Sequence, residues 1–188
     1  MKHIFFAFVC MLLLVHTVDA QKKSTNKPVR FLLGGALEFG GDKVAEVYFT
    51  DGSTQSLTAG QGGTLFAGAQ FRLNKKETFF LRSSIGIKYL TTKADNAHIR
   101  LTRIPLQVTA NYMPVKKLRL AAGMVTHQAI RLNFDGIGEN KKFTSVPGIV
   151  LEAGYGVFGL SYTFMTYQDP SNASYIANNF GITVSGVL

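Results

Sequence analysis

Among the polar residues of this sequence, His127 is the one best suited to catalysis, because a histidine can exchange a proton near neutral pH. A catalytic histidine needs a nucleophile within hydrogen-bond reach and a third group that orients its ring. Its neighbours Thr126 and Gln128 cannot serve, since in an extended strand they point to the opposite side. The remaining candidate partners come from elsewhere in the chain: Ser84, Ser161 and Glu152. The local sequence therefore favours a hydrogen-bonding histidine, and acyl transfer by a Ser–His–acid group is the alternative.

The sequence offers little that could hold a metal ion or a cofactor. His98 and His127 are separate histidines, and the one cysteine, Cys10, lies in an N-terminal apolar run. The segments Asp51-Gly52 and Asp135-Gly136 lack the alternating carboxylate spacing of a calcium loop, and they indicate turns. We therefore expect no metal and no cofactor.

Many of the basic residues stand at alternate positions within otherwise apolar stretches. In Thr78–Leu90 (TFFLRSSIGIKYL), Arg82 and Lys88 share one side with serine and glycine, while Phe79 and Ile87 lie on the other. Small polar neighbours suit a cramped interior, where buried charges must be paired or hydrogen-bonded. We predict an interior polar network in which the two glutamates bridge several arginines, and no wide pore. Its predicted members are Arg30, Glu38, Arg72, Arg82, Lys88, Arg103, Arg119, His127, Arg131 and Glu152.

The elements that must position this network are strands, because apolar residues recur with a period of two. Several candidate strands reach the ~9–11 residues that a tilted membrane-spanning strand needs, which is longer than the ~5–6 usual in globular sheets. The eight candidates are residues 29–39, 64–73, 78–90, 98–112, 118–133, 147–155, 157–167 and 179–188.

Short and long connections alternate between these strands. The short ones are residues 74–77, 114–117 and 155–156, and the long ones are residues 40–63, 91–97, 134–146 and 168–178. This segregation is typical of outer-membrane barrels, which have short periplasmic turns and long extracellular loops. The pattern therefore predicts an all-β protein, an eight-stranded antiparallel up-and-down transmembrane barrel.

The longest connection contains a hairpin of its own. Residues 44–50 and 53–58 flank Asp51-Gly52, a two-residue turn signal. The second arm offers only Leu57 to lipid, so we interpret the hairpin as an extension of the barrel wall outside the membrane. A barrel of ten strands is the alternative.

Alternation alone does not decide which face of the wall meets solvent. A soluble, lipocalin-like ligand-binding barrel would show it too, with the apolar face inside. The apolar faces here often carry an aromatic residue near each end, as at Phe31 and Phe39 or at Phe79 and Tyr89, which predicts aromatic girdles at two membrane interfaces. We therefore expect the apolar face to meet lipid. Ile99 and Leu101 are out of phase with Ile104, and we expect a β-bulge near Thr102.

The N-terminus has the features of a secretory signal. Lys2 and His3 precede the apolar run Ile4–Val15, which is too short to span a bilayer, and Val18-Asp19-Ala20 offers a cleavage site. We predict a signal peptide at residues 1–20, a flexible lead-in at 21–28 and a barrel domain at 29–188. The formal net charge of +9 is spread singly along the chain without a dense patch, so we expect no nucleic-acid partner and a role in contact with solvent or lipid phosphate.

The segment Arg103-Ile104-Pro105-Leu106-Gln107-Val108 and the following Tyr112-Met113-Pro114 resemble the PorT-like outer-membrane β-barrel domain family, and the whole of residues 29–188 is similar to small barrels of the OmpA/OmpX type. The resemblance implies a bacterial outer-membrane location and lipid as a partner. It implies no specific activity, because barrels of this size serve as anchors, adhesins, secretion accessories and lipid enzymes. We expect a non-enzymatic structural or surface-interaction role through the extracellular loops, with an extracellular or periplasmic protein as the partner. A lipid-A-modifying enzyme that uses His127 is the alternative.

Overall fold

The computed structural model describes residues 27–48, 52, 54–94, 97–136 and 138–188. The predicted signal peptide, most of the lead-in and Asp51 of the predicted turn lie outside these residues. Within them, no helix is long and apolar enough to cross a membrane. The strands are β1 (Val29–Phe39), β2 (Lys43–Tyr48), β3 (Thr54–Thr58), β4 (Gly62–Arg72), β5 (Phe79–Ala94), β6 (Ala97–Val115), β7 (Leu118–Asn133), β8 (Lys141–Tyr155), β9 (Phe158–Gln168), β10 (Ser174–Ile176) and β11 (Asn179–Val187).

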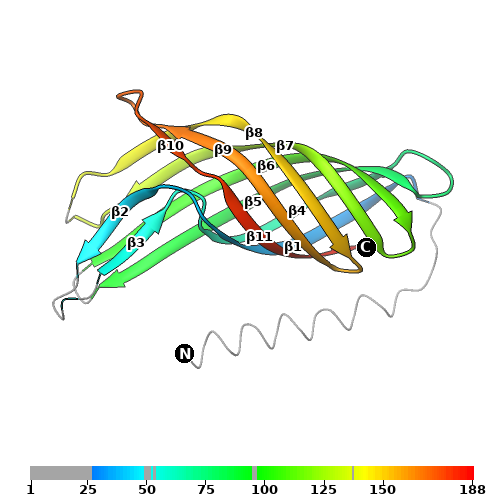
Figure 1. Cartoon of the computed structure of the whole chain (residues 1–188), viewed down its shortest axis with the longest axis horizontal. Helices are drawn as coiled ribbons and strands as arrows, with labels where there is room; N and C mark the ends of the chain where they lie inside the picture. Colours follow the sequence, from blue (N-terminus) through cyan, green and yellow to red (C-terminus); the bar gives the residue numbers. More distant parts are fainter. Residues whose placement is uncertain (1–26, 49–51, 53, 95–96, 137) are drawn as a thin grey trace.

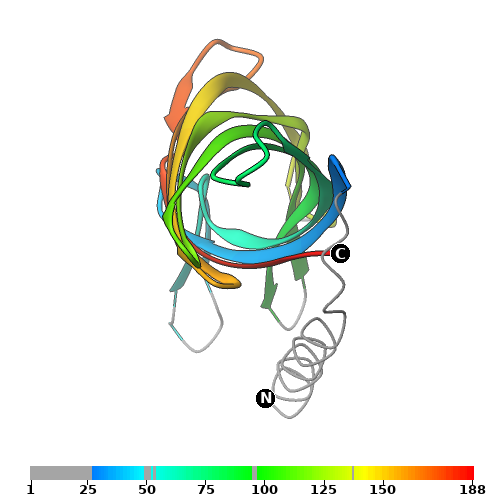
Figure 2. The same cartoon turned by 90° about the vertical axis from the view of Figure 1, so that its right-hand side faces the viewer.

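Eight of these strands close into a ring, as Figure 2 shows end-on. The order around the ring is β1, β4, β5, β6, β7, β8, β9 and β11, and β11 pairs back onto β1. Every neighbouring pair is antiparallel. The predicted fold class is confirmed, with eight wall strands rather than ten. Closure matters physically because it leaves no sheet edge with unpaired backbone groups.

The two ends of the barrel differ, and we name them by their connections. Residues 73–78, 116–117 and 156–157 form the basal end, where both β1 begins and β11 ends (Figure 1). The described residues within 40–61, 134–140 and 169–178 lie at the apical end. The predicted loop at 91–97 is wrong, because β5 runs to Ala94 and β6 begins at Ala97. The strand β8 likewise begins at Lys141, so much of the predicted loop at 134–146 is also wall.

The outer surface between the two ends is apolar. Leu65 is 69% exposed and Ile87 is 66% exposed, so the faces that the sequence marks as apolar point outward. We call this surface the apolar belt, and its large members include Phe31, Leu33, Leu37, Leu65, Phe71, Phe79, Ile85, Ile87, Leu106, Val108, Tyr112, Leu120, Met124, Ile149, Leu151, Phe158, Leu160, Tyr162, Phe164, Phe180 and Ile182. The inner face at the same level carries small and polar residues, among them Ser161, Thr163 and Thr183, which are buried.

The hairpin β2–β3 is correctly predicted as a hairpin, but it does not extend the wall. It forms a separate two-stranded sheet at the apical end (Figure 1). Two residues of the hairpin, Val47 and Leu57, are buried against inward-facing residues of the wall. We call the cluster so formed the apical core, and it comprises Val47, Leu57, Ala59, Ile99, Leu101, Val125, Ile130, Leu132, Phe143, Val150, Met165, Tyr167 and Ala177.

Two irregularities let the wall change its sidedness near the apical end. The ladder between β6 and β7 shifts register between Thr102 and Ile104, where two residues of β7 oppose one of β6. The bulge is therefore near the expected position, but the extra residue belongs to β7, where Ala129 has a φ of 50°. Ile99 and Leu101 consequently stay on the inner face rather than turning outward. A second shift, between Val146 and Ile149, places an extra residue in β8 itself and so turns Phe143 to the inner face.

Candidate functional site

The interior charges form three levels, each with its own acidic partner. At the basal end, Glu77 accepts a hydrogen bond from Arg30 at 2.8 Å and another from Arg72 at 3.3 Å. Glu77 follows β4 in the short turn and has a φ of 54°, and its carboxylate reaches both arginines at the basal end of the lumen. The sequence predicts Glu38 or Glu152 as the partner of Arg30 and Arg72. It does not predict Glu77, because the alternation of a strand says nothing about where a turn residue points.

The middle level is centred on Glu152 of β8. Its Oε1 accepts hydrogen bonds from Arg119 of β7 and, at 3.3 Å, from the Thr183 hydroxyl of β11. Arg119 also donates to the Asn111 side chain at 3.2 Å. Groups from β6, β7, β8 and β11 thus meet across the lumen, and the buried carboxylate is both ion-paired and hydrogen-bonded, as a buried charge requires.

Arg82 lies beside this group, and it forms no ion pair with a carboxylate of the described residues. Its Nε donates to the Gln70 Oε1 at 2.9 Å, and a terminal nitrogen donates to the Ser185 hydroxyl at 3.3 Å. The guanidinium also lies 5.3 Å from the ring centroid of Phe80, within the range of a cation–π contact. Neutral acceptors and a ring therefore hold this cation in place.

The upper level joins the wall to the segment that follows the hairpin. Glu38 is 3.0 Å from the Lys88 Nζ and accepts a hydrogen bond of 2.6 Å from the Thr64 hydroxyl. Lys88 also donates to the Gly60 carbonyl at 2.6 Å. Glu38 is predicted to bridge arginines, but in the structure it pairs with a lysine, Lys88.

Arg103 is 1% exposed, and it makes the second attachment to the same segment. Its two terminal nitrogens donate to the carbonyls of Ala59 and Gln61, each at 2.5 Å. Three successive carbonyls, those of residues 59–61, are therefore held by two buried cations. Because peptide carbonyls carry partial negative charge and no proton, they are suitable partners for lysine and arginine in a crowded interior. We call residues 59–61 with Lys88 and Arg103 the latch.

His127 lies inside the barrel, with its ring Nδ1 hydrogen-bonded to the Tyr167 hydroxyl. The Ser145 hydroxyl accepts from the His127 backbone nitrogen at 3.2 Å and donates to the Val146 carbonyl at 3.0 Å, so its hydrogen bonds are made with the backbone. The ring itself is 5.8 Å from that of Tyr167, centroid to centroid. The sequence analysis does not identify Tyr167 as a partner of His127. A signal was present, because the odd-numbered residues of this strand face inward and Tyr167 is one of them.

The structure brings most of the predicted network residues into the lumen and leaves one outside. Arg131 is exposed on the outer face, because the bulge at Ala129 reverses the alternation of β7 beyond that point. The prediction that Arg131 lines the lumen is therefore wrong. Among the described residues, no group of three metal-ligating side chains comes together.

The space left in the lumen is small. A cavity of about 70 Å³ remains between the middle and upper levels, and its lining includes Glu38, Arg82, His127 and Glu152. That volume admits a few water molecules and no larger solute. Eight strands leave an interior that side chains fill, and the side chains here do so.

Comparisons with known proteins add one structural likeness. No family model matches the chain, and no curated protein matches it. The crystal structure of Neisserial surface protein A (NspA) is similar, with 12% identity and a TM-score of 0.43 over 84% of this chain and 97% of that chain. At that level the likeness carries no weight for function, which has to be argued from the chain's own geometry.

Proposed function

We propose that this protein is an outer-membrane β-barrel with a structural or surface-interaction role, and that it acts through its apical end without catalysis. One observation carries the proposal: a closed ring of strands exposes a continuous apolar belt and keeps its charges inside. A soluble ligand-binding barrel requires the opposite arrangement, because its apolar face must line the cavity and its polar face must meet water.

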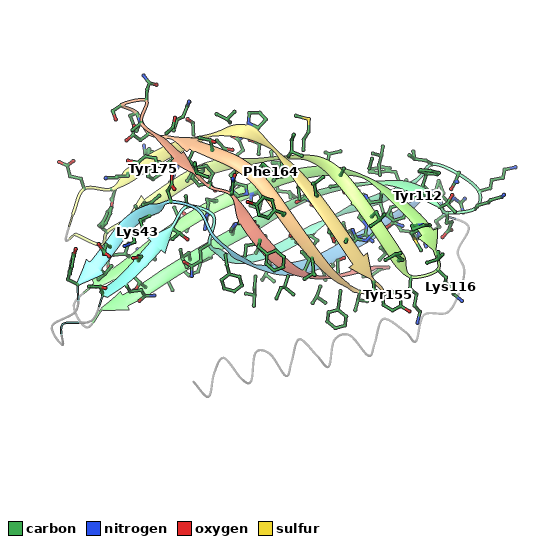
Figure 3. The ribbon with its side chains drawn as sticks, viewed as in Figure 1. Lys43, Tyr112, Lys116, Tyr155, Phe164 and Tyr175 are labelled. Carbon is green, nitrogen blue, oxygen red and sulfur yellow. The ribbon has the colours of Figure 1, made fainter. Side chains whose placement is uncertain are left out.

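The dimensions of the belt support a membrane location. On β5 the belt runs from Phe79 to Tyr89, about ten residue steps of ~3.3 Å each, which at a strand tilt of ~40° gives a height of roughly 25 Å. Aromatic rings mark its edges. Phe79 and Tyr112 stack with centroids 4.7 Å apart, and Figure 3 shows Tyr112 and Tyr155 at the basal end beside Lys116.

The lumen supports a role that is neither transport nor catalysis. The latch lies across the apical side, ion pairs cross the interior, and the cavity between them has a volume of only about 70 Å³. His127 has Tyr167 as its ring partner, with no serine or carboxylate hydrogen-bonded to that ring among the described residues. What remains available to a partner is the apical surface, chiefly the hairpin β2–β3, where Tyr48 is 75% exposed.

Membrane fractionation of cells that express the full-length chain tests the proposal. We expect the protein in the outer-membrane fraction, released only by detergent, with a gel mobility that changes on boiling because the closed barrel resists unfolding in detergent. Recovery of a monodisperse protein from the soluble periplasm without detergent would contradict it. An unchanged lipid A profile on expression of wild type and of His127→Ala argues against the enzymatic alternative, and a changed profile with wild type alone argues for it.

A further inference from the structure

Three cations gather on the outer face just above the apolar belt. Arg131 of β7 lies directly opposite Lys142 of β8 in the ladder, and Arg100 of β6 faces outward one step higher, opposite Asn133. Like charges directly opposite one another in a sheet destabilise it. A nearby anion would offset their repulsion.

The protein itself offsets only part of this positive charge. The Arg100 guanidinium is 3.8 Å from the Asp135 carboxylate, at the limit of an ion pair. The side chains of Arg131 and Lys142 have no hydrogen-bonded or ion-paired partner in the described part of the chain. An excess of about two positive charges thus remains at one point of the wall.

A hollow opens in the apolar belt on the same side, below the cations. It has a volume of about 700 Å³ and crosses β4 to β8. Its depth comes from small outward side chains, Ala67, Ala69 and Ser83, set between larger ones such as Ile85 and Met124. Pro147 of β8 and Thr126 of β7 form its upper edge, on the strands that carry Lys142 and Arg131.

The cations and the hollow are close enough to bind one molecule. Along β8, Pro147 is five residues from Lys142, which is ~16 Å at ~3.3 Å per residue. The cations lie at the level where lipid head groups begin, and the hollow lies at the level of acyl chains. This combination fits an amphiphile with an anionic head better than an acidic protein, which would have no use for a hollow inside the bilayer.

We propose that Arg131, Lys142 and Arg100 bind the phosphate of a lipid head group while one acyl chain of the same lipid fills the hollow. A phosphate monoester suits the site, because it carries a charge near −2 at neutral pH and several strong acceptor oxygens. A phosphodiester supplies only one charge. The inference rests on the proposed membrane location and goes beyond it by assigning a lipid class to one patch of the wall.

Native mass spectrometry of the full-length barrel, purified in detergent and titrated with phosphatidic acid, tests the assignment. We expect saturable retention of phosphatidic acid by the wild type, and a loss of about tenfold or more in affinity for Arg131→Gln/Lys142→Gln, because each substitution removes a charge-assisted contact. The matched control is Lys116→Gln/Lys117→Gln, which removes the same charge at the basal end and should bind as the wild type does. Equal affinities for all three proteins would overturn the proposal.

Two further arms separate the parts of the site. Phosphatidylglycerol should bind at least several-fold more weakly than phosphatidic acid, and equal binding would overturn the monoester assignment. Ala67→Leu/Ala69→Leu fills the hollow and should weaken retention, whereas Ala110→Leu/Ala122→Leu, which adds the same bulk outside the hollow, should not. A gel-mobility change on boiling, measured first on every variant, shows whether the barrel is folded. A failure of the membrane proposal would appear there, before any lipid is added.

Discussion

The belt level and the apical end of this barrel use the same strands with opposite sidedness. At the belt level, leucines and aromatic residues face outward, and arginine, lysine and glutamate fill the inside. At the apical end, Ile130, Leu132 and Phe143 face inward in the apical core, and Arg131 and Lys142 face outward. The surrounding medium accounts for the difference. In the proposed membrane location, lipid solvates apolar side chains at one level, whereas water at the other drives them together, and the bulges on β7 and β8 convert one arrangement into the other.

The largest expected effect comes from the interior of the belt. Glu152→Ala leaves the buried Arg119 without its carboxylate, and we expect the free energy of unfolding to fall by ~3–5 kcal/mol, the usual cost of an uncompensated buried charge. Urea unfolding of the barrel in lipid vesicles, followed by the gel mobility of unboiled samples, measures it.

The double variant Arg119→Met/Glu152→Leu is the control for that experiment. Because both charges leave together, it should lose less stability than Glu152→Ala alone, although Asn111 and Thr183 also lose partners. If Glu152→Ala were as stable as the wild type, Arg119 would be solvated by water rather than stabilised by its ion pair with Glu152.

The second prediction compares two leucines of β7. Leu132 is 0% exposed in the apical core, and Leu132→Ala should cost ~2–5 kcal/mol because it leaves a cavity. Leu120 faces outward in the belt, and Leu120→Ala should cost much less, since lipid fills the space. Unfolding in vesicles distinguishes the two. Equal costs would mean that the apical end lies in the same medium as the belt.

The sequence predicts the belt more accurately than the apical end, and the reason lies in what period two assumes. An uninterrupted alternation places Phe79, Arg82 and Lys88 correctly, because β5 runs without a bulge. The same rule fails at Arg131 and Ile130, since one extra residue reverses every side chain beyond Ala129. The hydrophobicity of Ile99 and Leu101 predicts that these side chains face lipid. In the structure they face inward and pack on the hairpin instead. No local pattern shows that Glu77 folds back to Arg30, or that residues 59–61 provide the carbonyls for Arg103.

The smallest expected effect concerns two arginines at neighbouring heights, one inside and one outside the wall. Arg103→Ala removes two hydrogen bonds from the latch, each usually worth ~1.5–3 kcal/mol. Because the detached segment can turn its carbonyls to water, we expect a net loss of about one such bond, ~1.5–3 kcal/mol. Because Lys88 still holds the Gly60 carbonyl, the barrel should stay folded while the hairpin detaches more often. Planar-bilayer recordings should then show brief openings that the wild type lacks, and hydrogen exchange at residues 57–61 should rise.

Arg131→Ala removes the same side chain from the outer face, and it should change neither measurement, since surface substitutions usually stay within ±0.5 kcal/mol. Openings of the same frequency in both variants would show that the latch does not hold the apical side closed, and that the lumen is sealed by the ion pairs below it.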